Sequence, residues 1–220
     1  FEINGPELIG LIGPNGAGKT TLTNVLDGAI KPNSGTVYLG GNRIDQLQPF
    51  EVARHGLGRT FQVTRSFRRM TVLENLMVPA LALDQGLSRS EIDDKAMEVL
   101  EFLTVDHLRN EYAKSLSGGQ QKLLELGRLL MLNPDVIILD EPFAGVHPKL
   151  MEIIYKYIER VNNDGTAIIL ISHQMDSIFS LCKRLLVLNY GDLIADGTPD
   201  VVKNDPTVIE AYLGSDDEED

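Results

Sequence analysis

A glycine-rich run near the start of the chain has the residue types and spacing that bind phosphate. It follows a short apolar stretch, Glu7 to Ile12, and precedes a segment with helical spacing. Glycines at such a place let backbone N–H groups point at phosphate oxygens, and the following helix N-terminus adds partial positive charge. A chance glycine turn is the alternative, which the flanking strand and helix disfavour. The predicted loop consists of Gly13, Pro14, Asn15, Gly16, Ala17, Gly18, Lys19 and Thr20, with Thr21 beside it.

Two acidic residues could complete a site for a magnesium nucleotide. Asp140 and Glu141 follow Val136 to Leu139, an apolar segment that predicts a buried strand. In such a site Lys19 would contact the β- and γ-phosphates, and the Thr20 hydroxyl and Asp140 would hold Mg²⁺. Glu141 would act as the general base toward the attacking water. Acidic pairs also occur in ordinary turns, so the pair indicates catalysis only because a phosphate-binding loop precedes it.

A second group of residues predicts another anion site. Ser117, Gly118, Gly119 and Gln120 come directly before a helical stretch, Gln121 to Leu132. A serine hydroxyl and glycine amides at a helix N-terminus can hold an anion. One ATP needs only one phosphate-binding loop, so we expect this turn to contact the γ-phosphate bound by a second subunit in a head-to-tail dimer. The alternative is an ordinary serine cap after a glycine-rich loop.

Apolar strands alternate with helical segments along the chain, which predicts an α/β protein. Its mostly parallel sheet would be covered on both faces, with an antiparallel β portion. Ligands bind at the carboxyl ends of such strands, where most of the candidate residues lie. Between Met70 and Pro134 the pattern becomes helical, with capping-box spacing at Thr71 and Glu74 and at Ser90 and Asp93. We therefore expect a core of residues 1–66 and 134–220 and an inserted helical subdomain of residues 67–133.

Composition excludes several classes of protein. The formal net charge of -12 disfavours non-specific binding to nucleic acid. No stretch reaches the roughly 18 consecutive apolar residues of a membrane span, so a membrane connection would require a partner. The single cysteine, Cys182, cannot form an internal disulfide, and this favours a reducing, cytosolic compartment.

The motifs together resemble the ATP-binding subunits of ABC transporters over essentially the whole chain. The resemblance rests on Leu116 to Gln120 (LSGGQ), the phosphate-binding loop, the Asp140–Glu141 pair and His173. It implies a P-loop ATPase core that binds ATP and Mg²⁺. It also implies that Gln62 contacts Mg²⁺ and the attacking water, that His173 contacts the γ-phosphate and pairs with Glu141, and that residues 144–147 touch a second ATP-binding subunit.

Softer features narrow the resemblance to the ATPase subunits of branched-chain amino-acid importers. These are Arg59 to Gln62 (RTFQ), Met70 to Leu76, Glu141 to Val146, and Tyr212 to Gly214. Such a subunit would lie at the cytoplasmic face of the membrane, bound to integral permease subunits, and would depend indirectly on an extracytoplasmic solute-binding protein. Arg65, Arg68 and Arg69 could dock on the permease or form a solvated basic loop. The family's adenine-stacking aromatic residue would precede Phe1, so we expect the natural protein to begin earlier.

The sequence leaves two alternative functions to consider. A soluble ABC-type ATPase acting on a protein assembly or on DNA would typically carry a long coiled coil or a basic face, and the sequence has neither. A GTP-driven switch would carry an N-K-x-D stretch, which is also absent from the sequence. We therefore expect an ATP-hydrolysing transport subunit.

Overall fold

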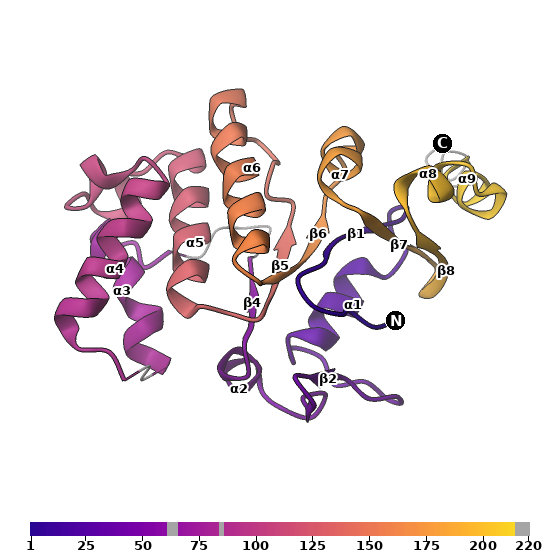
Figure 1. The fold of residues 1–220 in the computed structure, drawn as a ribbon, viewed down its shortest axis with the longest axis horizontal. Helices are drawn as coiled ribbons and strands as arrows, with labels where there is room; N and C mark the ends of the chain where they lie inside the picture. The colour runs from indigo at the N-terminus through magenta and orange to yellow at the C-terminus, as the bar shows by residue number, and fades with distance from the viewer. Residues whose placement is uncertain (61–65, 84–85, 214–220) are drawn as a thin grey trace.

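The computed structural model describes residues 1–60, 66–83 and 86–213. Six strands form one sheet in the order β4-β5-β6-β1-β7-β8 (Figure 1). The first five are parallel to one another, and β8 pairs antiparallel with β7. The strands are β1 (Leu8–Ile12), β4 (Leu57–Arg59), β5 (Val136–Asp140), β6 (Ala167–Ile171), β7 (Arg184–Asn189) and β8 (Asp192–Gly197). The expected α/β class, with a mostly parallel sheet and an antiparallel portion, is confirmed.

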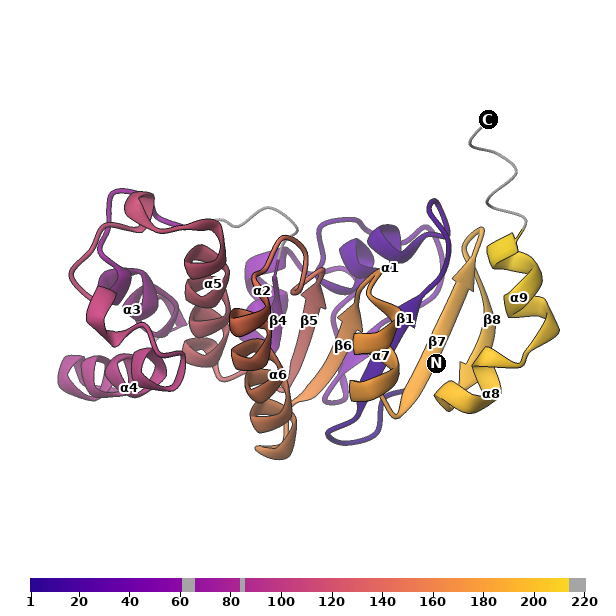
Figure 2. The same cartoon turned by 90° about the horizontal axis from the view of Figure 1, so that it is seen from above.

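Helices cover both faces of the sheet. Figure 2 shows α6 (Pro148–Asn163) and α7 (Met175–Leu181) on one face and α1 (Lys19–Leu26) on the other. The short α2 (Pro49–Arg54) and the small hairpin of β2 (Tyr38–Leu39) and β3 (Asn42–Arg43) lie on the α1 side (Figure 1). Two short helices, α8 (Pro199–Lys203) and α9 (Pro206–Leu213), follow the edge strand β8.

Alternation along the strands supplies two apolar cores. In β1, Ile9 and Leu11 pack with Leu22 of α1 in one core. Leu8 and Ile12 point to the opposite face, into the core that contains Tyr157 of α6. Since β1 is buried along its whole length, it holds the residues that follow it in a fixed place.

Three helices form a separate group beside β4 and β5 (Figure 1). They are α3 (Val72–Leu83), α4 (Arg89–Phe102) and α5 (Gly118–Leu132), with 3₁₀ turns at Asp106–Leu108 and Ala113–Ser115. Gly127 allows the close approach of these helices, because a Cβ there would lie 2.8 Å from Leu76 Cδ2 and 3.0 Å from Leu103 Cδ1.

One capping prediction was wrong. The capping box of α4 is formed by Ser88 and Glu91, not by Ser90 and Asp93: Ser88 N donates to Glu91 Oε2 at 2.7 Å, and Glu91 N donates to Ser88 Oγ at 3.3 Å. Glutamate has the extra methylene needed to reach back to the cap N–H, whereas aspartate is shorter. The predicted box of Thr71 and Glu74 is present at the start of α3.

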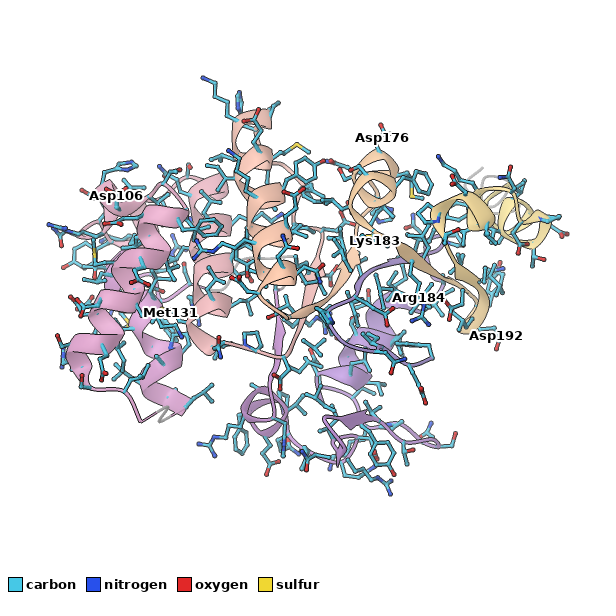
Figure 3. All side chains as sticks on the ribbon, in the orientation of Figure 1. Asp106, Met131, Asp176, Lys183, Arg184 and Asp192 are labelled. Carbon is cyan, nitrogen blue, oxygen red and sulfur yellow. The ribbon has the colours of Figure 1, made fainter. Side chains whose placement is uncertain are left out.

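Arg184, which is labelled in Figure 3, is the first residue of β7 and connects this strand to β8 and to the residue before β1. Its guanidinium binds both carboxylate oxygens of Asp196 in β8, each at 2.7 Å, and donates to Glu7 Oε2 at 2.9 Å. These contacts hold β1 and the hairpin of β7 and β8 in register. Within the residues that the structure describes, no helix has the length and apolar character needed to cross a membrane.

Candidate functional site

The phosphate-binding loop connects β1 to α1 in a backbone conformation that requires glycine. Gly13 has φ 148°, and a Cβ there would lie 2.1 Å from the carbonyl oxygen of Leu188 in β7. Gly18 has φ 100° and directly precedes α1. The turn after β7 supports the loop, because Gly191 N donates to Ala17 O at 2.9 Å. The loop is therefore packed against the sheet and is not a loose surface turn.

Lys19 is folded back over the loop. Its Nζ donates to Gly13 O at 2.7 Å and to Pro14 O at 2.9 Å. Burial lowers its pKa, and the nearby carboxylates of Glu141 and Asp140 oppose that shift. The ammonium is therefore held at the loop by two backbone carbonyl oxygens, in the wall of a cavity.

The two carboxylates lie at the end of β5. Asp140 is the last residue of that strand, and Glu141 has the left-handed φ of 50°, uncommon for a residue other than glycine. Glu141 Oε1 lies 3.6 Å from His173 Nε2, and Ser172 Oγ donates to Glu141 Oε2 at 3.4 Å. Burial raises the pKa of Glu141, and His173 acts in the opposite direction.

A cavity of about 240 Å³ joins these parts. It lies at the carboxyl ends of β1, β5 and β6, as predicted for a ligand site in a parallel sheet. Its chemistry suits a magnesium nucleotide, because loop N–H groups and an ammonium face two carboxylates. Within the described part of the chain, no group of three or more aspartate, glutamate, histidine or cysteine side chains is arranged so that it could hold a metal ion. The lining residues are Asn15, Gly16, Ala17, Gly18, Lys19, Thr20, Thr21, Asp140, Glu141, Ile171 and His173.

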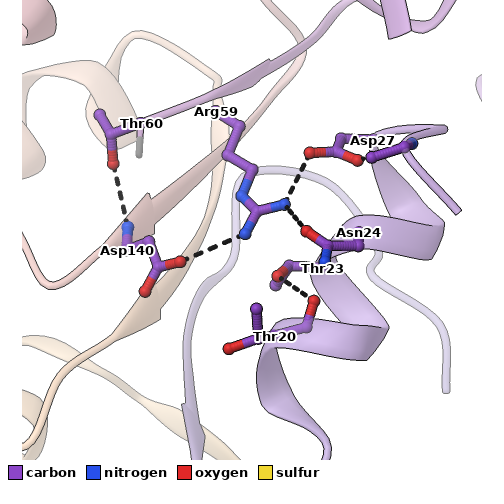
Figure 4. Close-up of polar contacts among 8 residues, drawn as sticks. Thr20, Thr23, Asn24, Asp27, Arg59, Thr60 and Asp140 are labelled. Carbon is purple, nitrogen blue, oxygen red and sulfur yellow. Dashed lines mark hydrogen bonds and ion pairs between the residues drawn. The ribbon is translucent and has the colours of Figure 1, made fainter. Parts of the chain in front are cut away.

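Arg59, at the end of β4, connects Asp140 to the helix that follows the phosphate-binding loop (Figure 4). Its guanidinium donates to Asp140 Oδ2 at 3.2 Å, to Asp27 Oδ2 at 2.6 Å and to Asn24 Oδ1 at 2.7 Å. The backbone N–H of Asp140 also donates to Thr60 Oγ1 at 3.0 Å. Sequence reasoning missed this role, because the partners of Arg59 are 32, 35 and 81 residues away.

The serine-glycine turn does not line this cavity. Ser117 caps α5: its hydroxyl accepts from Gln120 N at 3.3 Å, and its own N–H donates to Gln120 Oε1 at 2.9 Å. Gly118 and Gly119 form the first turn of α5. The turn therefore does not contribute to the phosphate site of its own chain. A turn that contacts the ATP of a second subunit would have to lie outside that site in the same way.

The other predicted residues divide into two groups. Gln62 and Arg65 lie outside the described residues. His147 is the N-cap of α6, where its Nδ1 accepts from Lys149 N at 3.3 Å.

Tyr212 of α9 was not predicted as a site residue, yet it contacts the phosphate-binding loop. A hydrogen bond from the backbone of Gly13 lowers its pKa, against the larger rise that burial causes. The end of the described chain is thus packed against the first residue of the loop. An aromatic residue in an otherwise ordinary terminal helix carries no sequence signal for such a contact.

Comparison with known families agrees with this geometry. Residues 1–144 match the family described as "ABC transporter", and residues 193–218 match "Branched-chain amino acid ATP-binding cassette transporter". The high-affinity branched-chain amino acid transport ATP-binding protein LivG of Escherichia coli K12 is 39% identical over 228 residues, covering 97% of this chain and 89% of the relative. The lipopolysaccharide export system ATP-binding protein LptB of Haemophilus influenzae is 37% identical over 214 residues, covering 97% and 88%.

Solved structures show the same fold. An ATP-binding cassette of an ABC transporter in its ADP conformation superposes with a TM-score of 0.83 at 36% identity, covering 97% of this chain and 90% of the other. A dimeric cassette in a post-hydrolysis state, bound to ADP and phosphate, gives a TM-score of 0.81 at 26% identity, covering 90% and 88%. With a phosphate-binding loop, a carboxylate pair and a capped serine-glycine turn on this fold, the chain belongs to the ABC transporter family and is one of its ATP-hydrolysing cassettes.

Proposed function

We propose that this chain is the ATP-hydrolysing subunit of an importer for branched-chain amino acids. The observation that carries the proposal is the cavity in which Lys19 and the phosphate-binding loop face Glu141 and His173. The choice of solute is supported by the similarity to LivG and by the match of residues 193–218 to the branched-chain amino-acid cassette family.

The residues of the cavity divide the work of hydrolysis. The loop N–H groups and Lys19 bind the β- and γ-phosphates, which orients the γ-phosphorus toward water near Glu141. Glu141 takes a proton from this water while the water oxygen forms a bond to the γ-phosphorus. The bond from the γ-phosphorus to the β–γ bridging oxygen breaks at the same time, which releases ADP and phosphate. Glu141 Oε1 is buried and accepts no hydrogen bond from the residues that the structure describes, so it can accept one from the water.

His173 and the metal-binding residues complete the site. His173, which lines the cavity 3.6 Å from Glu141, would contact the γ-phosphate and orient Glu141. Thr20 and Asp140, with Gln62, would hold Mg²⁺, whose charge would offset the charge of the phosphates.

We further propose a head-to-tail dimer with a second ATP-binding subunit, identical or paralogous. Ser117, Gly118, Gly119 and Gln120 of each subunit would contact the γ-phosphate in the other. A dimeric relative supports this arrangement, as does the absence of that turn from the chain's own cavity. Residues 67–133 would move against the core of residues 1–66 and 134–220 as the dimer closes.

A second cavity offers a place for the permease. It measures about 700 Å³, and residues of both subdomains line it, among them Arg54, His55, Leu87 and Lys95. Gly56 and Asp135, which directly precede β4 and β5, also line it, so it lies at the end of the sheet away from the ATP cavity. A permease segment bound there would follow movement between the subdomains, at the cytoplasmic face of the membrane. Arg68 and Arg69 are exposed and could add contacts. A solute-binding protein would act on the far side of the permease.

Two experiments test the proposal. Glu141→Gln should still bind ATP, should form a stable dimer with it, and should lose turnover by roughly 10²-fold or more. Co-expression with candidate permeases, followed by uptake of labelled leucine into vesicles loaded with ATP, tests the solute. ATP-dependent lipopolysaccharide extraction without uptake would instead assign the chain to the class of LptB, and failure to co-purify with any membrane protein would favour a soluble ATPase.

A further inference from the structure

Lys122 is a buried cation that belongs to neither phosphate site. It lies in the second turn of α5 and is only 8% exposed. Its Nζ donates to the carbonyl oxygens of Glu141 at 2.6 Å and of Ala144 at 3.1 Å. Burying an ammonium is costly unless its hydrogen bonds are satisfied, so these two contacts hold α5 firmly against the turn after β5.

The α5 side of this link is the serine-glycine turn. Ser117 caps the helix five residues before Lys122, and the helix joins the two rigidly. Gly119 packs against α6, because a Cβ there would lie 2.3 Å from Leu150 Cδ1. A displacement of the turn is therefore passed both to α6 and, through Lys122, to the end of β5.

The other side of the link is the backbone of Glu141. This residue has the left-handed φ of 50°; its N–H donates to Ile171 O at 2.9 Å, and its carbonyl also accepts from Ala144 N at 3.3 Å. An uncommon conformation persists only where its surroundings determine it. The Lys122 ammonium is one of those determinants, so its position affects where the Glu141 carboxylate points.

We propose that Lys122 is a positioning residue that couples the two ATP sites of the dimer. The proposal rests on the head-to-tail dimer proposed above. In that dimer the serine-glycine turn of a subunit serves its partner's ATP, whereas Glu141 of the same subunit serves its own ATP. Lys122 joins these two elements within one chain. Binding of the partner's γ-phosphate at Ser117 shifts α5, and Lys122 carries the shift to Glu141.

Coupling of this kind makes hydrolysis cooperative. Two coupled sites allow a Hill coefficient of up to about 2, whereas independent sites give 1. The decisive measurement is the ATPase rate of the whole protein as a function of ATP concentration. We expect Lys122→Met to lower the Hill coefficient toward 1. The maximal rate should also fall, roughly 10- to 100-fold, because the catalytic carboxylate of Glu141 would be misplaced. Lys122→Arg, which keeps a cation, should restore much of the cooperativity.

The matched control is Lys203→Met. Lys203 Nζ lies over the ring of Phe179, 4.2 Å from its centroid, and the residue lines neither cavity. This variant should keep the wild-type Hill coefficient. The affinity of the monomer for ATP should change little in all three variants, because neither Lys122 nor Lys203 lines the ATP cavity. A Hill coefficient equal to that of wild type in Lys122→Met, or a wild-type coefficient of 1, would overturn the coupling.

A second measurement decides the matter if Lys122→Met does not fold. In a mixed dimer of wild type and Ser117→Arg, isolated through two different tags, one ATP site keeps all its groups. Uncoupled sites predict half the wild-type rate, whereas coupling predicts less than about a tenth. A rate of one half would refute the proposal. Failure of the dimer itself is recognised separately, since Glu141→Gln would then stay monomeric with ATP.

Discussion

Nε2 of His173 lies 3.6 Å from Oε1 of Glu141, and that buried oxygen accepts no hydrogen bond from the residues that the structure describes. The side chain of Glu141 is only 12% exposed. Water therefore stabilises its charge poorly, and histidine compensates only in part. The balance between these two effects has consequences for both activity and stability.

Because burial raises the pKa of Glu141 above 4.5, the ATPase should lose activity as pH falls through the raised value. Glu141 can act as a base only when it is deprotonated. His173 opposes the rise in the pKa of Glu141, so His173→Gln should move this acid limb to higher pH. Measurement of the maximal rate between pH 5 and 9 in both proteins tests this, and an unchanged acid limb would contradict the electrostatic role of His173.

The same pKa shift predicts a change in stability. The folded chain holds the Glu141 proton more tightly than the unfolded chain does, so the free energy of unfolding decreases as pH rises from 4.5 through the raised pKa. Glu141→Gln removes this titration. Its melting temperature should therefore exceed that of wild type at neutral pH, and the difference should shrink as pH approaches 4.5. A constant difference across this range would count against the shift.

Lys19→Ala should weaken ATP binding roughly 10- to 100-fold, the worth of one charge-assisted contact. The side chain bridges Gly13 O and Pro14 O, so its loss also removes a support of the loop. Equilibrium titration with a fluorescent ATP analogue measures the affinity. Lys31→Ala, which changes an exposed lysine beyond α1, is the control and should bind as wild type does.

Much of this site could be predicted from sequence because its motifs are local. The phosphate-binding loop needs only adjacent glycines between a strand and a helix, and the Asp140–Glu141 pair only needs an apolar strand before it. The strands β1, β5 and β6 were recognisable as short apolar runs between turn residues, since strands that are buried on both faces do not alternate.

The side-chain contacts that hold the site in place could not be predicted from the sequence. Arg59, Lys122 and Tyr212 reach partners 19 to 199 residues away, as the Lys122–Glu141 and Tyr212–Gly13 pairs show. Pairing at such separations depends on the order of strands in the sheet, which one sequence does not determine. The three-residue β4 was missed for a different reason, because such a short element completes too little of a periodic pattern.

Arg59→Met should lower the free energy of unfolding by about 3 to 5 kcal/mol, because it leaves two largely buried carboxylates without their shared cation. The side chains of Arg59, Asp27 and Asp140 are 6%, 11% and 15% exposed. Arg160→Met is the matched control: its ion pair with Asp164 is exposed, and its loss should cost less than about 1 kcal/mol. Urea denaturation compares the two, and equal losses would show that the Arg59 network contributes no more than a surface pair.

Gly119→Ala should separate the packing role of the serine-glycine turn from its contact with the partner's phosphate. An alanine Cβ would lie 2.3 Å from Leu150 Cδ1, so α5 or the leucine side chain must move. If packing alone requires glycine, the double variant Gly119→Ala/Leu150→Ala recovers both the melting temperature and the ATPase rate. We expect recovery of the melting temperature only, with the rate still reduced by roughly tenfold or more, because the added methyl group also obstructs an anion that approaches the helix N-terminus. Leu150→Ala alone, measured in parallel, gives the cost of the truncated leucine. Full recovery of the rate in the double variant would argue that Gly119 has no part in binding the partner's ATP.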